Sequence, residues 1–291
     1  MIKTRFGAYL RENKTQEKWL NKLYGNFFGR CVLKILTLPF ISKIVGKFMD
    51  SELSIPLIKP FIRKNFIDMD DYERVDYKSY NEFFTRKIIP SARPVSYVPT
   101  DFICPCDSKL TVYEINESSL FSIKNSLYSV EDLLKNKSLA KKYQGGYCLI
   151  FRLCVDDYHR YCYIDNGVKG TNKFIKGELH TVNPIALKYY NIYKRNSREY
   201  TILRTENFGD VVQVEVGALL VGKICNHHGK HKFRRGEEKG MFQFGGSTVV
   251  LLVQRDKVII DKDILENSAN GFETMVQYGE KIGNKKDSKG Q

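Results

Sequence analysis

A run of five aliphatic residues, VVLLV at 249–253, directly follows the segment FGGST at 244–248. An apolar, β-branched run bounded by a turn signal predicts a buried strand, and two glycines leave the backbone before it free to adopt unusual conformations. The pattern therefore places the hydroxyl of Ser247 at the entrance of a buried strand, beside the unshielded carbonyl of Gly246. Such a serine is suited to attack the peptide bond that precedes it. A glycine turn leading into a strand accounts for the same residues.

Charge narrows the class of partner. The 291 residues include 47 Lys and Arg against 33 Asp and Glu, which gives a net charge of +14. An excess of this size favours a polyanion, either nucleic acid or an anionic lipid surface. The basic residues are dispersed, and no nucleic-acid recognition motif is present. We therefore predict an anionic phospholipid membrane as partner, and no nucleic acid.

The cysteines and the N-terminus indicate the compartment. Seven cysteines are scattered without framework spacing, and the first residues, MIKTR, lead into a polar stretch rather than an apolar signal sequence. These features predict reduced thiols in a cytosolic compartment. No run of about eighteen apolar residues is present to form a spanning helix. We therefore expect a peripheral protein on the cytoplasmic side of the cell membrane.

The first third of the chain has an amphipathic pattern. Residues 19–48 and 55–64 interleave aliphatic and aromatic residues with lysine and arginine, and Pro39 interrupts the first stretch. Apolar faces with basic rims suit helices that lie in the membrane interface. A helical subdomain that packs on the rest of the protein gives the same pattern.

The pattern changes from Arg93 onward to short β-like runs separated by turn signals, which predict strands. The runs are 147–153, 211–216, 218–221, 248–253 and 257–260. We therefore predict an α+β protein with a helical membrane-associating region at 1–86 and a β-rich, sandwich- or barrel-like catalytic core at 87–283. The polar, lysine- and glycine-rich residues 284–291 are predicted to be a disordered tail.

Few residues are candidates for chemistry. His159 follows the predicted strand 147–153, in a polar loop of the kind that often carries a general base. Asp107 lies in a turn, and Asp, His and Ser together can activate a serine; the sequence does not show that Asp107, His159 and Ser247 converge. A second group contains Cys225, His227, His228 and His231. Its spacing matches no familiar ligand pair and its flanks are basic, so we interpret it as an exposed loop and predict no metal.

Seven segments, taken in order, resemble the pyruvoyl-dependent phosphatidylserine decarboxylases. They cover about Tyr80 to Gly283, and the N-terminal third resembles this family only in its amphipathic character. The segments are YNEFFTR at 80–86 with ARPV at 92–95, CDS at 106–108, DYHR at 157–160, GELHTVNP at 177–184, VEVGA at 214–218, KGMF at 239–242 leading to GGST at 245–248, and YGE at 278–280.

The resemblance implies a lyase of phospholipid biosynthesis, made as a zymogen that cleaves itself between Gly246 and Ser247. His159, oriented by Asp107, takes the proton of Ser247, whose hydroxyl attacks the Gly246 carbonyl to form an ester; elimination then splits the chain. The products are a β chain (1–246) and an α chain (247–291) that form a heterodimer. Residue 247 becomes a pyruvoyl group, the cofactor of the enzyme.

The resemblance also implies the reaction. The pyruvoyl ketone forms a Schiff base with the amine of phosphatidylserine and accepts the electrons released as carbon dioxide leaves, as other carbonyl cofactors do. The product is phosphatidylethanolamine. His159 is again the candidate for the acid that protonates the carbanion.

Three positions depart from the family pattern. Gly245 stands where leucine is frequent, Ser108 where glycine is common, and Cys162 where many members have a second histidine. The last departure leaves two interpretations: His159 serves both self-cleavage and decarboxylation, or His180 contributes.

Other functions fit the same residues. One alternative is the same chemistry on another serine-bearing lipid. A second is a non-catalytic lipid-binding protein, whose chain stays uncut. A third is a conventional serine hydrolase, in which Ser247 stays intact and reacts with a fluorophosphonate probe.

Overall fold

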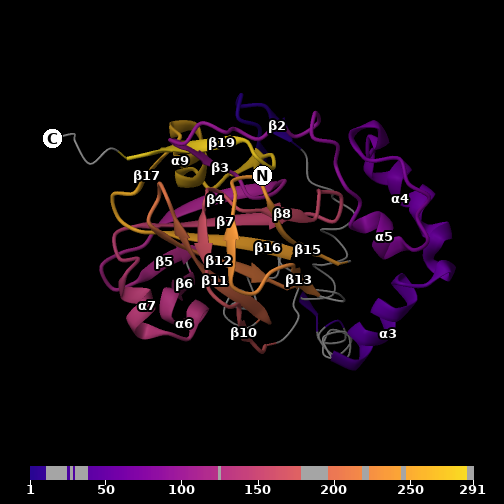
Figure 1. Ribbon diagram of the computed structural model, residues 1–291, viewed down its shortest axis with the longest axis horizontal. Helices are drawn as coiled ribbons and strands as arrows, with labels where there is room; N and C mark the ends of the chain where they lie inside the picture. Colours follow the sequence, from indigo (N-terminus) through magenta and orange to yellow (C-terminus); the bar gives the residue numbers. More distant parts are fainter. Residues whose placement is uncertain are drawn as a thin grey trace.

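The computed structural model describes residues 1–10, 25–26, 29, 39–123, 126–177, 196–217, 223–243 and 247–286. A β-rich core carries a group of short helices along one side (Figure 1). The α+β class predicted from the sequence is confirmed.

One large sheet of eleven strands forms the centre of the core. Its order is β14 (His231–Phe233), β9 (Gly167–Lys169), β11 (Arg198–Thr205), β12 (Asp210–Val216), β16 (Ser247–Val253), β7 (Tyr147–Leu153), β4 (Ser108–Glu114), β18 (Glu273–Val276), β1 (Ile2–Lys3) and β2 (Tyr9–Leu10), with β10 (Lys173–Ile175) beside β11. The pairs are antiparallel except β1 with β18. Within the described residues the order has two ends, so the sheet is not a closed barrel.

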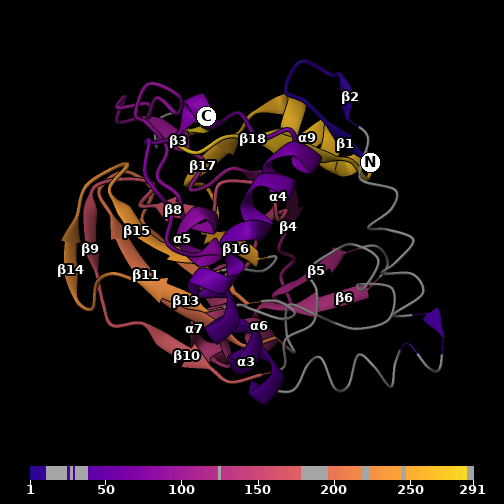
Figure 2. The same ribbon diagram turned by 90° about the vertical axis from the view of Figure 1, so that its right-hand side faces the viewer.

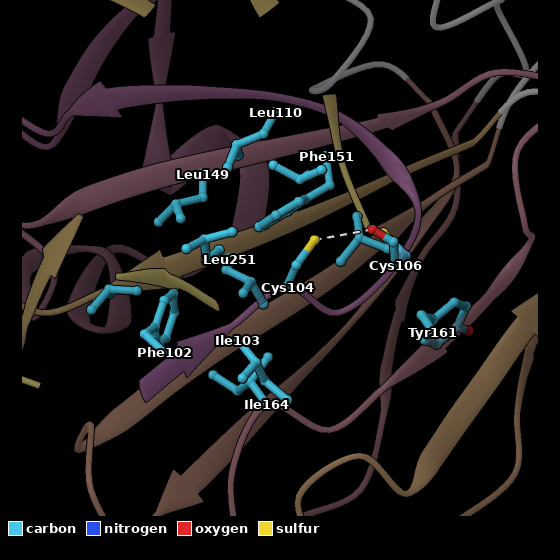
Figure 3. Close-up of a cluster of buried hydrophobic side chains, with 14 of the residues drawn as sticks. Phe102, Ile103, Cys104, Cys106, Leu110, Leu149, Phe151, Tyr161, Ile164 and Leu251 are labelled. Carbon is cyan, nitrogen blue, oxygen red and sulfur yellow. Dashed lines mark hydrogen bonds between the residues drawn. The ribbon is translucent and has the colours of Figure 1, made fainter. Parts of the chain in front are cut away.

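The central strand β16 is buried on both faces, which explains its unbroken apolar sequence. Successive side chains point to opposite faces of a strand. Val250 and Leu252 belong to a cluster with residues of α6 (Val130–Leu134) and α7 (Lys137–Lys141). Val249 and Leu251 belong to a second cluster on the other face. Figure 3 shows Leu251 of this second cluster among other buried side chains.

Three smaller sheets and a helix complete the core (Figures 1 and 2). They are the sheet β13 (Ile224–Asn226), β15 (Glu238–Phe242) and β8 (Arg160–Cys162); the sheet β17 (Val258–Ile260), β19 (Lys281–Lys285) and β3 (Asp101–Ile103); the hairpin β5 (Leu120–Ile123) with β6 (Ser126–Ser129); and α9 (Lys262–Ala269). The second apolar cluster contains residues of the first two of these sheets and of α9, so it fills a sandwich between them and the large sheet.

The helical layer contains α3 (Pro39–Met49), η1 (Glu52–Leu57), α4 (Ile58–Asn65), η2 (Met69–Asp71) and α5 (Tyr80–Phe84). Its own cluster of buried residues includes Ile58, Phe83 and Phe84. Helix α5 begins with a side-chain cap, because Ser79 Oγ accepts a hydrogen bond from the Glu82 N–H at 3.1 Å. The described residues contain no helix that is long and apolar enough to cross a membrane.

The structure corrects two boundaries predicted from the sequence. The region 1–86 is not helical throughout, because β1 and β2 extend the large sheet, and Arg5 forms ion pairs with Asp261 and Asp263. The tail predicted from 284 is ordered at its start, because Asn284 and Lys285 belong to β19 and pair with β17. Both segments are too short to show the alternation of apolar and polar residues that predicts a strand.

The predicted strands 147–153, 211–216, 248–253 and 257–260 are confirmed as β7, β12, β16 and β17, with small shifts at their ends. The predicted strand 218–221 and the tail residues 287–291 lie outside the described residues.

Candidate active site

Ser247 is the first residue of β16, as the glycine pair and apolar run predict. It pairs with Leu153, the last residue of β7, so it lies where the pairing of these two central strands ends. The side chain is fully buried, and its hydroxyl has no hydrogen-bond partner among the described residues. An unpartnered buried hydroxyl is costly to maintain. It is a candidate for a functional group rather than a structural one.

His159 lies fully buried in the loop between β7 and β8. Its Nδ1 is 2.8 Å from the carbonyl oxygen of Asp157, and its Nε2 has no hydrogen-bond partner among the described residues. Since a carbonyl oxygen can only accept, the proton resides on Nδ1 and Nε2 carries a lone pair. Burial, helped by the positive charge of Arg86, lowers the pKa of His159 to about 3. The imidazole is therefore neutral at physiological pH, with a free basic nitrogen.

Two backbone contacts connect the surroundings of His159 with those of Ser247. The carbonyl of His159 accepts a hydrogen bond from the N–H of Phe242 at 2.9 Å, and Phe242 ends β15. Only residues 243–246 separate Phe242 from Ser247, which pairs with Leu153. The Gly246–Ser247 bond therefore lies in a short connection that is tied to the His159 loop at both ends.

A buried ion pair fixes the loop that carries the histidine. Lys109 Nζ lies 2.6 and 2.7 Å from the two carboxylate oxygens of Asp157, and the N–H of Cys154 donates to the same carboxylate at 2.6 Å. Burial acts to lower the pKa of Lys109, but the Asp157 carboxylate outweighs it, so the net direction is upward. Burial raises the pKa of the Asp157 carboxyl, and the charge of Lys109 opposes that shift. These contacts position the Asp157 carbonyl that orients His159.

Residues of the segment YNEFFTR form one wall around His159. The ring of Phe84, at the end of α5, lies 4.1 Å from the imidazole of His159, measured between ring centroids. Arg86 is buried and stacks on the rings of Tyr72 and Phe83. The guanidinium donates to the Asp156 carbonyl at 3.4 Å. This wall removes water from the imidazole and places a positive charge near it.

The predicted hydrogen bond between Asp107 and His159 is absent from the described structure. Instead, Asp107 accepts from Arg93 Nε and Nη2 at 2.8–3.0 Å, and from the N–H of Tyr278 at 2.8 Å. A forked guanidinium matches a carboxylate in two places at once, so Arg93 outcompetes a single imidazole N–H. The group that orients His159 is the Asp157 carbonyl.

Asp107 remains connected to the histidine loop by packing. The ring of Tyr278 meets that of Tyr158 edge to face at 5.8 Å. Tyr158 directly precedes His159 in the chain. Asp107 thereby joins the segments ARPV and YGE beneath the histidine loop, which explains why these distant motifs accompany one another.

Cys162 does not replace a histidine in the site. Its side chain is buried in the second apolar cluster, and burial raises the pKa of the thiol to about 12. A thiol in that state is a poor proton carrier at neutral pH. The other residue considered for this role, His180, lies outside the described residues, as do Gly245 and Gly246.

Sequence reasoning missed a buried ion pair between β12 and β15. Glu215 of β12 and Lys239 of β15 are both fully buried, with Lys239 Nζ 2.7 Å from Glu215 Oε1. Asn226 of β13 bonds to both side chains. The pair links the large sheet to β15, the strand that leads into the 243–246 connection. The signal available in the sequence was one charged residue in each of two otherwise uncharged segments, Glu215 in VEVGA and Lys239 in KGMF.

Comparison with known proteins finds one family. A family model described as phosphatidylserine decarboxylase matches residues 80–284. A protein of Clostridium acetobutylicum named phosphatidylserine decarboxylase proenzyme 2 is 49% identical over 277 residues, which cover 95% of each chain. Two proteins named phosphatidylserine decarboxylase proenzyme, from Clostridium botulinum strains Hall and Alaska E43, are 42% and 40% identical. The matched residues cover 96% and 95% of this chain, and 99% and 96% of the two relatives.

Proposed function

Because the chain belongs to the phosphatidylserine decarboxylase family, we propose that it is a self-processing proenzyme that converts phosphatidylserine to phosphatidylethanolamine. The observation that carries the proposal is that the candidate nucleophile and the candidate base are both buried polar atoms left without a hydrogen bond. Ser247 Oγ and His159 Nε2 are both buried without a hydrogen-bond partner among the described residues, and the same short connection joins their surroundings.

Self-cleavage follows from this chemistry. His159 Nε2 takes the hydroxyl proton, and Ser247 Oγ attacks the Gly246 carbonyl carbon. The Gly246–Ser247 C–N bond breaks, an ester to Oγ forms, and the amino group of residue 247 is freed. Loss of the Cα proton of residue 247 then breaks the Cβ–Oγ bond and releases the carboxylate of Gly246. Water replaces the remaining nitrogen, which leaves as ammonia, and a ketone remains at the new N-terminus.

The residues present fit the pyruvoyl group that this route produces. Its precursor is a buried serine, which is shielded from bulk water. His159 is buried as well, and its Nε2 has no hydrogen-bond partner among the described residues. The ketone supplies the electron sink for decarboxylation. His159 is the proposed proton carrier for both steps: a low pKa makes its protonated form a strong acid, so a proton held on Nε2 transfers readily. Asp107 is proposed as a positioning residue that acts through Tyr278 and Tyr158.

The two chains produced by cleavage are proposed to stay together. Residues 247–286 supply β16, β17, α9, β18 and β19. In the large sheet β16 lies between β12 and β7, both from the β chain, and β18 lies between β4 and β1. Separating the chains would expose both faces of the core, so a stable heterodimer is expected.

The experiment that tests the function uses the purified full-length protein. Intact-mass analysis is expected to give two fragments that meet at Gly246 and Ser247, the smaller one lighter by one ammonia than a serine-started chain and reactive with a carbonyl reagent. Vesicles that contain phosphatidylserine are expected to yield carbon dioxide and phosphatidylethanolamine. A folded protein that stays uncut and inert would contradict the proposal. A panel of other serine-bearing lipids decides the substrate.

The helical layer is the proposed membrane contact, on the cytoplasmic side of the cell membrane. Its exposed apolar side chains include Leu53 and Phe66, which are 76% and 92% exposed. Exposed basic residues lie on α3 and α4 of the same layer: Lys47, Lys59, Arg63 and Lys64. Apolar insertion together with attraction to anionic headgroups suits the surface of a bilayer. A diacyl substrate resides there, so this contact would bring the site to its substrate.

We predict that Phe66→Glu weakens binding to anionic vesicles about tenfold, because a phenylalanine side chain contributes roughly 1.5–3 kcal/mol when fully buried. Vesicle sedimentation measures the effect, and added salt is expected to weaken wild-type binding further by screening. The matched control is Phe174→Glu, which changes an exposed phenylalanine on β10. Equal loss in both variants, or no loss in either, would count against the helical layer as the contact.

A further inference from the structure

Two histidines and a glutamate gather on the side of the core that carries the edge strand β14. His228 lies in the loop between β13 and β14, His231 begins β14, and Glu237 directly precedes β15. One potential ligand atom from each residue lies within 4.8 Å of the others. The turn from β14 to β15 thus brings a carboxylate to the two imidazoles.

Both imidazoles approach the same carboxylate oxygen. His231 Nε2 is 2.7 Å and His228 Nε2 is 3.8 Å from the same oxygen, Glu237 Oε1. The two imidazole rings are stacked, with centroids 3.8 Å apart and planes 6° apart. An ion about 2.0–2.2 Å from both Nε2 atoms has to lie in the plane of each ring, so binding requires the stacked rings to rotate apart around the shared Glu237 oxygen. The ion would replace the proton now shared between His231 and Glu237.

The surroundings orient one of the ligands. The hydroxyl of Tyr163 lies 3.2 Å from His228 Nδ1, the nitrogen that faces away from Glu237. Tyr163 is buried and stacks on Phe233 of β14, with ring centroids 4.3 Å apart. An outer hydrogen bond to the second nitrogen is the usual support of a metal-ligating histidine, because it fixes the tautomer and the ring. It leaves His228 Nε2 available as a ligand.

The donor set indicates the class of ion. Two imidazoles and one carboxylate suit zinc and its neighbours, and a site with three protein ligands keeps a position for water. The cluster is also open to entry, since the three side chains are about 30% exposed and Glu237 borders a cavity of about 840 Å³. Lys169 adds positive charge nearby, with its Nζ 2.7 Å from the carbonyl oxygen of His228. Glu237 offsets part of that charge.

We propose that His228, His231 and Glu237 bind a divalent transition metal of the zinc class, which ties the β13–β14 loop to the start of β15. This site is separate from Ser247 and His159, and it does not depend on the proposed decarboxylase activity. It revises the interpretation of residues 225–231 as a plain basic loop. The ligand that the sequence pattern lacked is Glu237, and Cys225 and His227 are not members of the site.

The test measures Zn²⁺ binding to the chelator-treated full-length protein by equilibrium dialysis, with Co²⁺ absorption in the visible range as a report on the ligands. We expect one ion per chain and a higher melting temperature in Zn²⁺. His231→Ala and Glu237→Gln should each weaken binding more than about tenfold, and Tyr163→Phe about tenfold, in line with the loss of an outer-shell partner. Glu237→Gln keeps an acceptor for the Arg234 N–H, which now donates to Glu237 at 2.9 Å.

Two neighbouring variants serve as controls. His227→Ala removes a histidine whose Nε2 faces Glu238 instead, and Cys225→Ser removes a half-exposed thiol. Both should bind Zn²⁺ like the wild type. The proposal is overturned if folded wild-type protein binds no Zn²⁺, if Glu237→Gln and His231→Ala bind it unchanged, or if a control variant loses it.

Discussion

Ser247→Ala is expected to leave the whole protein as a single uncut chain of 291 residues. The only non-hydrogen atom lost is Oγ, the proposed nucleophile. Water is not expected to replace it as the nucleophile, because the position is fully buried at the start of β16. The substitution removes a buried polar atom that has no hydrogen-bond partner, so the free energy of unfolding should not fall. Intact-mass analysis after expression measures the result, and the pyruvoyl ketone and all decarboxylation should disappear with the cut.

Thr248→Val is the matched control for this experiment. Thr248 is the next residue of β16, and its buried hydroxyl also has no hydrogen-bond partner among the described residues. Alternation along the strand directs it to the opposite face. We expect this variant to cut itself, because the nucleophile and His159 are untouched. Cleavage that persists in Ser247→Ala, or that stops equally in both variants, would contradict the assignment of Ser247.

His159→Gln is expected to slow self-cleavage by roughly 10²–10⁴-fold, the usual contribution of a positioned general base. The variant keeps a polar side chain of similar size but has no basic nitrogen. The rate is measured from the time course of uncut chain after synthesis. His227→Gln, at a partly exposed histidine outside the site, should cut at the wild-type rate. An unchanged rate in His159→Gln would eliminate it as the base.

The pH dependence gives an independent test of the same residue. Burial lowers the pKa of His159 to about 3, so the basic form is already populated above that pH. The wild-type cleavage rate should therefore be flat between about pH 5 and 8, rather than rise through 6.5 as for a free imidazole. A rise centred near 6.5 would show that the imidazole titrates in water.

The same pKa makes a prediction about stability. Between about pH 3 and 6.5 the unfolded chain binds a proton at His159 that the folded chain does not. Acid therefore favours unfolding by about 1.4 kcal/mol per pH unit in this range, and stability returns as the pH rises. His159→Gln should lose this part of the acid sensitivity in denaturant titrations.

Local pattern was enough to predict the strand β16, and together with the family resemblance it led to Ser247 and His159 as the proposed nucleophile and base. The run at 247–253 is apolar throughout because β16 is covered on both faces, and that burial is visible in the sequence as an unbroken aliphatic segment. Ser247 and His159 were each proposed from a short motif around the residue itself, GGST at 245–248 and DYHR at 157–160. Charge and amphipathicity likewise predicted the basic, apolar character of the helical layer.

Only the tertiary structure decided which polar groups meet. Asp107 bonds to Tyr278, 171 positions away, and not to His159. Glu237 completes a cluster with two histidines because β14 and β15 turn back on one another, and β1 reaches the sheet through a pairing with β18. Burial and strand formation are local averages over many side chains, so a sequence carries them redundantly. A hydrogen bond depends on the register of distant strands to within a fraction of an ångström, and the competition among its partners is settled only when the chain has folded.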